Sequence, residues 1–240
     1  MNKQYTFEEF TEIIKTLRSE NGCPWDKEQT HNSLKPCMME EAAELLAAIR
    51  IYDTCGSYEN MKEELGDILL QVVMHSRIAE EEGLFSVNDV ISEVSKKMIR
   101  RHPHVFGDVK AETAAEVLSN WDDIKKKEKE NQSWIESPLR EIPPELPALT
   151  RASKILKKQD KLYEKTPDLN QTIKKLKECI SGMEYFLNDA DSNQESFEKC
   201  YAEALLLMSN IAMKNKIPSE QILTDKIDEI IEKYEPNNIK

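Results

Sequence analysis

Glycine is scarce in this sequence, with six residues among 240, or 2.5%, where about 7% is usual. The scarcity leaves little room for Gly-rich phosphate loops, and neither G-x-G-x-x-G nor G-x-x-x-x-G-K-[ST] occurs. It also favours helices, because Gly is the residue that most commonly weakens them.

Metal-binding cysteine pairs and long apolar runs are missing as well. The chain has five cysteines, an odd number, and the sequence contains no C-x-x-C motif. We therefore expect neither a disulfide framework nor a zinc site. The longest apolar runs, such as ILLQVVM, fall far short of the ~18 residues of a membrane span. The polar N-terminus, MNKQYTFEEF, has no signal-peptide core. We therefore expect a cytoplasmic protein with free thiols and no membrane partner.

Basic residues are outnumbered: 33 Lys and Arg against 45 Asp and Glu give a net charge of −12. An acidic chain repels polyanions, which disfavours binding to nucleic acid or to anionic membranes. A small anionic substrate fits only if metal ions or a local basic patch mediate its binding. The length allows one large domain or two small ones.

Apolar residues recur at helical spacing along most of the chain, and no convincing alternating strand occurs, so we predict an all-α fold. Thr6 and Glu9 form a capping-box pattern at the first helix. Four of the ten prolines lie within residues 137–147, which predicts a linker between an N-terminal domain, 1–136, and a C-terminal domain, 148–240. The expected helices span about 6–20, 36–52, 58–82, 86–101, 111–130, 148–162, 169–188, 194–215 and 218–234, with a loop over 21–36.

The most informative feature is a pair of acidic motifs, EEAAE at Glu40–Glu44 and EELGD at Glu63–Asp67. On helical wheels, Glu41 and Glu44 lie side by side at the edge of an apolar stripe, and Glu64 and Asp67 do the same on the next helix. Two helices joined by a short connection pack antiparallel, so the acidic edges can converge. Four converging carboxylates repel unless cations lie between them, and oxygen ligands suit Mg²⁺ or Mn²⁺. The alternative is a solvated acidic surface.

A basic and aromatic complement accompanies these acids. Lys97 and Arg101 share one helix face and could neutralise a phosphate chain, although cations also favour any helix C-terminus. Trp25 could stack on a nucleobase, or it could be an aromatic residue that closes the edge of the core. Glu28 and His31 form a single E-x-x-H in a loop, whereas a di-iron site needs two on helices, so we reject such a site.

The ordered blocks GCPWDKEQTHNSL, EEAAELLAAI, EELGDILLQVVMHSRIAEEEGLFS and SKKMIRRHPHVFGDV resemble the MazG-type nucleoside triphosphate pyrophosphohydrolases. The resemblance runs from about Leu17 to Val109. It implies an all-α NTP pyrophosphatase fold that works as a homodimer or higher homo-oligomer. It also implies Mg²⁺-dependent cleavage of a nucleoside triphosphate to monophosphate and diphosphate, a housecleaning reaction on the nucleotide pool.

The resemblance also implies site residues, which we carry over position by position. Glu40 is a candidate general base or a more distant acid of the cluster, and Glu63 is expected to be solvated. The implied metal ligands are Glu41, Glu44, Glu64 and Asp67, the phosphate-binding residues are Lys97 and Arg101, and the base-binding residue is Trp25.

The second half of the chain resembles a damaged copy of the first. When residues 65–73 are aligned with residues 201–209, Asp67 corresponds to Glu203, but Glu64 corresponds to Cys200. A similar alignment of the helix that carries Lys97 and Arg101 replaces both of these basic residues by acids. We therefore expect a degenerate helical repeat with a structural or dimerising role.

Two alternatives remain open at the level of sequence. One is a non-catalytic helical module that binds nucleotides or a protein partner. The other is a metal-dependent phosphohydrolase that releases orthophosphate or acts on a different phosphorylated metabolite.

Overall fold

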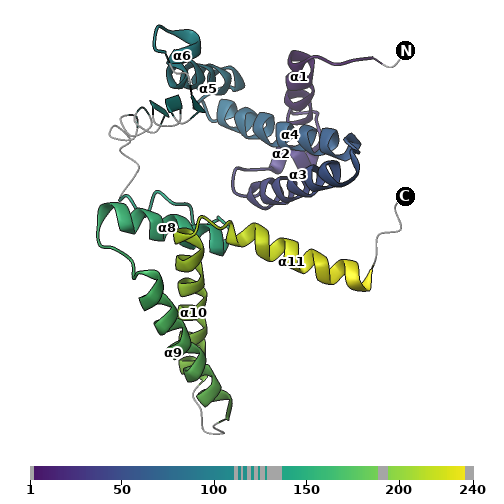
Figure 1. Ribbon diagram of the computed structural model, residues 1–240. Coiled ribbons are helices and arrows are strands. Elements are labelled where there is room, and N and C mark those ends of the chain that lie inside the picture. The colour runs from purple at the N-terminus through teal and green to yellow at the C-terminus, as the bar shows by residue number, and fades with distance from the viewer. Residues whose placement is uncertain are drawn as a thin grey trace. The chain divides into compact units, whose positions relative to one another are not determined.

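The computed structural model describes residues 3–110, 137–188 and 194–235, together with eight positions between 110 and 137. Within these residues all regular elements are helices, which confirms the predicted all-α class. The chain divides into two compact units, Met1–Lys129 and Glu130–Lys240, whose helices are labelled in Figure 1. No helix in the described ranges combines the length and apolarity needed to cross a bilayer. The eight isolated positions are Thr113, Ala114, Glu116, Val117, Asn120, Trp121, Ile124 and Glu128.

Unit 1 is organised around its longest helix, α4, which packs against α1, α3 and α5. Its buried core consists of side chains from α1, α4 and the residue preceding α3: Ile14, Leu34, Val73, Met74 and Ile78. The helices are α1 (Phe7–Leu17), α2 (Pro24–Glu28), α3 (Lys35–Cys55), α4 (Glu59–Glu81), α5 (Val87–Arg101) and α6 (Pro103–Phe106).

Side-chain caps and glycines set the helix limits in unit 1. Thr6 and Glu9 form the predicted capping box, since the Thr6 N–H donates to Glu9 and the Glu9 N–H donates to Thr6 Oγ1. Ser86 caps α5 in the same way with Asp89. Gly56 follows α3 with φ 74°, a left-handed conformation that ends a helix at little cost only for glycine. The short turn after Gly56 brings α4 back against α3.

Two details of the sequence prediction for unit 1 are wrong. Residues 21–36 are not a continuous loop, because Pro24 occupies a first-turn position and starts the short helix α2. A second short helix, α6, begins at Pro103, where the sequence predicts none. The helix expected over 111–130, including the lysine-rich stretch from Trp121, lies mostly outside the described residues.

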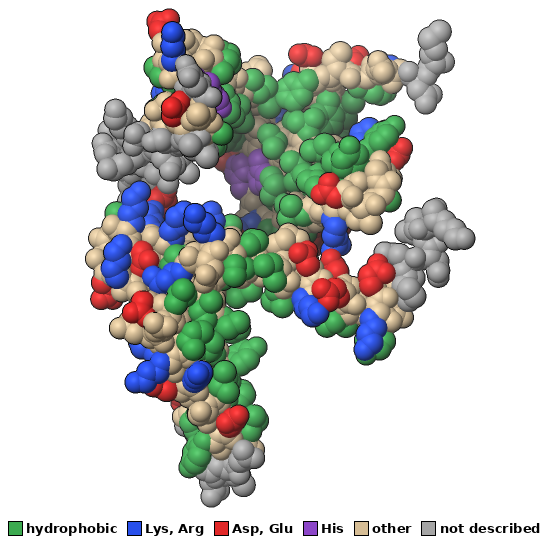
Figure 2. Space-filling view, viewed as in Figure 1, with side chains coloured by type: hydrophobic (Ala, Val, Ile, Leu, Met, Phe, Trp, Pro, Cys, Tyr) green, Lys and Arg blue, Asp and Glu red, His purple; other side chains and the backbone are tan. Residues whose placement is uncertain are grey.

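The apolar stripe beside the acidic motifs is only partly buried. The helical wheels placed it in the core, but Leu46 is 69% exposed and Leu65 is 52% exposed. The core of unit 1 lies on another side of α4, where Val73 and Met74 meet α1. Figure 2 shows hydrophobic side chains gathered at the surface over α3 and α4.

Unit 2 is a second helical bundle in which α10 packs against α8 and α9, and α11 packs against α8. Its bounds agree closely with the predicted helices: α8 (Ala148–Leu162), α9 (Leu169–Asn188), α10 (Gln194–Lys214) and α11 (Ser219–Tyr234). The Pro-rich segment 137–147 falls within this unit, where Glu141 pairs with Lys158 of α8. The degenerate repeat and the domain limits stay predictions from the sequence.

Asp160 in unit 2 carries a testable pH dependence. It accepts a hydrogen bond from the Thr166 N–H at 2.6 Å and pairs with Lys214 at 3.2 Å. The pKa of Asp160 is lowered from 3.8 to about 2, chiefly by the hydrogen bonds from Thr166 and to a smaller extent by Lys214. The folded state therefore holds this proton more weakly than the unfolded state. The stabilisation is present above the unfolded-state pKa of 3.8, decreases as the pH falls below about 4 and is mostly lost at about pH 2.

We expect Asp160→Asn to reduce the free energy of unfolding by about 1–2 kcal/mol at pH 7, because the charge on the acceptor is lost while its shape is kept. The difference from the wild type, measured by thermal melts at a series of pH values, should close between pH 4 and pH 2. A difference that stays constant across this range would contradict the assignment.

Candidate active site

Three carboxylates from two helices converge in unit 1. Glu41 comes from the first half of α3, and Glu64 and Asp67 lie one turn apart near the start of α4. One carboxylate oxygen from each residue lies within 4.8 Å of the other two. Glu64 is only 8% exposed, and the other two side chains are half-buried. We call these three residues the carboxylate cluster.

The electrostatics of the cluster are unfavourable without a cation. Burial raises the pKa of Glu41, and the negative charges of Asp67, Glu44, Glu64 and Glu40 raise it further. Because like charges at this separation repel, each carboxylate favours the neutral form of its neighbours. A donor set made only of carboxylate oxygens fits a hard divalent cation such as Mg²⁺ or Mn²⁺.

The other predicted acids lie outside the cluster. Glu44 and Glu40 are exposed side chains on α3 that lie close enough to affect the pKa of Glu41. Glu63 is exposed on α4. The structure thus brings together three of the four acids predicted as metal ligands, and the ligand role of Glu44 stays a prediction.

The predicted phosphate-binding cations lie near the end of α5. Arg101 donates from Nε to Glu128 at 3.0 Å and also from Nη2, and Arg100 donates to the same carboxylate at 2.6 Å. These hydrogen bonds lower the pKa of Glu128, and those from Arg101 have the larger effect. The Arg101 guanidinium also lies 6.0 Å from the ring centre of Trp121, within cation–π range. Lys97 is half-buried one turn earlier on α5.

Sequence reasoning missed Glu128. The residue lies 27 positions after Arg101 in a stretch that was interpreted only as a solvated helix. The sequence around Glu128 does not distinguish it from the neighbouring charged residues. Its partners lie on α5, which is distant in the sequence and is brought close only by the fold.

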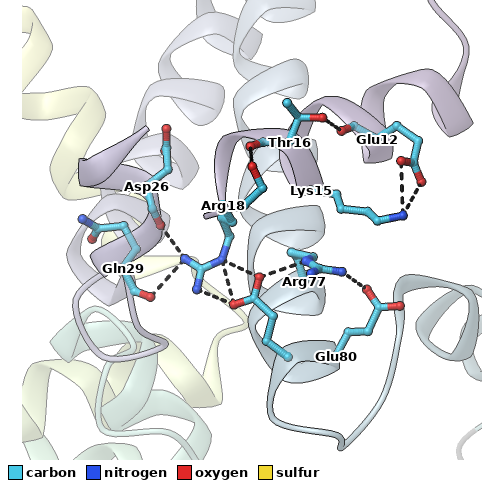
Figure 3. A network of polar contacts seen from close by, with 10 residues as sticks. Glu12, Lys15, Thr16, Arg18, Asp26, Gln29, Arg77 and Glu80 are labelled. Carbon is cyan, nitrogen blue, oxygen red and sulfur yellow. Dashed lines mark hydrogen bonds and ion pairs between the residues drawn. The ribbon is translucent and has the colours of Figure 1, made fainter. Parts of the chain in front are cut away.

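Trp25, the predicted base-binding residue, is 59% exposed on α2. Its segment is held to α4 by the buried guanidinium of Arg18. Arg18 donates to the carbonyl oxygens of Asp26 and Gln29 and forms an ion pair with Glu81 at 2.8 Å (Figure 3). The exposed indole is therefore carried by an anchored helix, although the structure does not bring it into the carboxylate cluster.

His31 has a partner that the sequence did not reveal. Its Nδ1 lies 2.8 Å from Nδ1 of His75 on α4. The rings are within 5° of parallel with centroids 5.1 Å apart, so the nitrogens meet edge to edge rather than face to face. One Nδ1 must donate and the other accept. Burial, and then the neighbouring His31, lower the pKa of His75. The pair ties the segment before α3 to α4.

The chain matches a known family over this part of unit 1. A family model described as the MazG nucleotide pyrophosphohydrolase domain matches residues 29–106. The matched range contains the carboxylate cluster together with Lys97 and Arg101, and it begins after Trp25.

The similarity to individual relatives extends over more of the chain. The Thermotoga maritima protein named nucleoside triphosphate pyrophosphohydrolase/pyrophosphatase MazG is 37% identical, over 95% of this chain and 94% of that protein. The Escherichia coli K12 nucleoside triphosphate pyrophosphohydrolase is 40% identical, over 83% of this chain and 74% of its own length. YabN of Bacillus subtilis, described as uncharacterized, is 53% identical over 64% of this chain, which spans only 30% of YabN. The chain belongs to the MazG family of nucleotide pyrophosphohydrolases.

Proposed function

We propose that this chain hydrolyses nucleoside triphosphates to the monophosphate and diphosphate, with unit 1 as its catalytic part. The carboxylate cluster is the observation that carries the proposal. Glu41, Glu64 and Asp67 offer oxygen ligands within 4.8 Å of one another, and the raised pKa of Glu41 marks a site that needs a compensating positive charge. A relative named for this activity matches 95% of the chain.

In this proposal Glu41, Glu64 and Asp67, with Glu44 at the exposed edge, hold Mg²⁺ or Mn²⁺. The bound cation would polarise the phosphate and lower the pKa of a water molecule. The protein's own groups position the substrate and compensate its charge. Glu40 is our candidate to accept the proton of the attacking water, because it lies next to Glu41 and is exposed.

In this proposal Lys97 and Arg101 bind the leaving diphosphate and compensate its negative charge. Glu128 occupies the Nε and Nη2 edge of Arg101. The remaining donors of the guanidinium can still bind phosphate oxygens, since Arg carries five N–H donors in a planar fork. Trp25 is assigned to stacking on the base, which its exposure permits.

Product analysis tests the reaction. Purified protein with Mg²⁺ and a panel of ribo- and deoxyribonucleoside triphosphates should release diphosphate in equal amount to monophosphate, and a chelator should stop the reaction. Release of orthophosphate would favour the alternative phosphohydrolase, and the absence of turnover would favour the non-catalytic module. The ranking of the panel would show whether a canonical nucleotide is the substrate of a housecleaning enzyme.

We also propose that the chain forms a homodimer through the exposed apolar surface of α3 and α4. Leu46 and Leu65 are more than half exposed, and Leu69 is 40% exposed. Contiguous apolar surface of this kind is costly in water and typical of an interface. It is the same apolar stripe that the helical spacing predicts to be buried in a core.

Light scattering after size exclusion tests the dimer. The wild type should have about twice the 27.8 kDa mass of one chain, and Leu46→Glu with Leu65→Glu should shift it to one chain, because charged side chains at an apolar interface are strongly disfavoured. Leu84→Glu is the matched control, since Leu84 is 67% exposed in the turn before α5. A wild type with the mass of one chain would contradict the dimer.

A further inference from the structure

In the part of the chain that the structure describes, one side chain donates a hydrogen bond to the carboxylate cluster. Asn60, on the first turn of α4, donates from Nδ2 to Glu64 Oε1 at 2.6 Å. Among the described residues, neither Glu41 nor Asp67 has a hydrogen-bond or ion-pair partner. Asn60 is therefore the single described side chain that holds a member of the cluster in place.

The position and chemistry of Asn60 suit this task. It precedes Glu64 by one helical turn, so the two side chains lie on the same face of α4. Its amide is neutral and occupies only Oε1, which leaves Oε2 of Glu64 without a hydrogen-bond partner among the described residues. A Lys or Arg at the same place would neutralise Glu64 and compete with a cation, whereas an amide orients the carboxylate and keeps its charge.

We propose that Asn60 is a positioning residue of the metal site, which orients the Glu64 carboxylate for a divalent cation. The inference rests on the proposed function, because it assumes that the carboxylate cluster binds the cation. Glu64 is nearly buried among like charges, so an unrestrained side chain would turn away from Glu41 and Asp67. Asn60 opposes this rotation and thereby raises the affinity of the cluster for the ion.

Calorimetric titration of the full chain with Mn²⁺ tests the proposal without depending on turnover. Asn60→Leu, which removes the donor, should weaken Mn²⁺ binding about 10-fold or more. Asn60→Gln should recover part of this loss, since a Gln amide also reaches a carboxylate one turn away. In parallel, the Mg²⁺ concentration for half-maximal activity should rise in Asn60→Leu, while kcat at saturating Mg²⁺ should stay within about threefold.

A matched control separates positioning from general helix stability. Gln221 donates to Asp225 at 2.7 Å, also an amide-to-carboxylate contact one turn apart, but on α11 in unit 2. Gln221→Leu should leave Mn²⁺ affinity unchanged. Wild-type affinity in Asn60→Leu, or an equal loss in Gln221→Leu, would overturn the proposal.

Glu64→Gln distinguishes failure of this inference from failure of the proposed function. If Glu64→Gln loses Mn²⁺ binding and Asn60→Leu does not, the cluster binds metal and only the role of Asn60 is wrong. If Glu64→Gln binds Mn²⁺ as the wild type does, the proposed metal site itself is wrong, and the inference falls with it.

Discussion

Replacing Glu64 by Gln is expected to lower kcat/KM for nucleoside triphosphate hydrolysis by about 10³-fold or more, a loss of about 4 kcal/mol of transition-state stabilisation. Gln has nearly the same shape as Glu and can still accept the hydrogen bond from Asn60, so α4 should be undisturbed. What disappears is a buried negative charge that lies within 4.8 Å of oxygens from Glu41 and Asp67. The cluster should then hold a divalent cation too weakly to compensate the charge of the substrate.

Steady-state kinetics with diphosphate release as the readout, together with far-UV circular dichroism, measure this effect. Glu63→Gln is the matched control, because Glu63 is the adjacent acid on α4 and is exposed. It should retain activity within about twofold, as expected of a solvated surface charge. A Glu64→Gln variant with wild-type turnover and unchanged helicity would remove the carboxylate cluster from the mechanism.

Replacing Arg18 by Ala is expected to reduce the free energy of unfolding of unit 1 by about 3 kcal/mol or more. The Arg18 side chain is 5% exposed, and it joins Glu81 on α4 to two carbonyl groups at the C-terminal end of α2, those of Asp26 and Gln29 (Figure 3). Burial opposes ionisation of Glu81, yet Arg18 and then Arg77 hold the pKa of Glu81 below its usual value. Removing Arg18 leaves a partly buried carboxylate and two carbonyls without their main donor.

Urea unfolding followed by tryptophan fluorescence measures the loss. Lys15→Ala removes an exposed ion pair with Glu12 and is expected to cost less than about 0.5 kcal/mol. Similar losses in the two variants would show that the Arg18 network contributes little beyond a surface ion pair.

The helices and the acidic motifs could be predicted from the sequence because both depend on local spacing. Three of these signals lie within a few residues of the helices that they define. They are the apolar periodicity of α4, the Thr6–Glu9 capping box and the glycine after α3. The i, i+3 spacing of Glu64 and Asp67 fixes their shared helix face in the same way.

The remaining features depend on contacts between segments far apart in the chain. The pairing of Arg101 with Glu128, and that of His31 with His75, join residues 27 and 44 positions apart. A helical wheel identifies an apolar stripe but not the element that covers it. For that reason Leu46 and Leu65 were assigned to a core and are exposed in unit 1.

In the proposed reaction water attacks the α-phosphorus of the nucleoside triphosphate and diphosphate leaves, and hydrolysis in water enriched in ¹⁸O tests this central claim directly. After a single turnover with Mg²⁺, the products are separated and their masses are measured by mass spectrometry. The account predicts one ¹⁸O atom in the nucleoside monophosphate and none in the diphosphate. Label in the diphosphate would place the attack on the β-phosphorus, and label in orthophosphate would place it on another bond. Either result would contradict the proposed reaction.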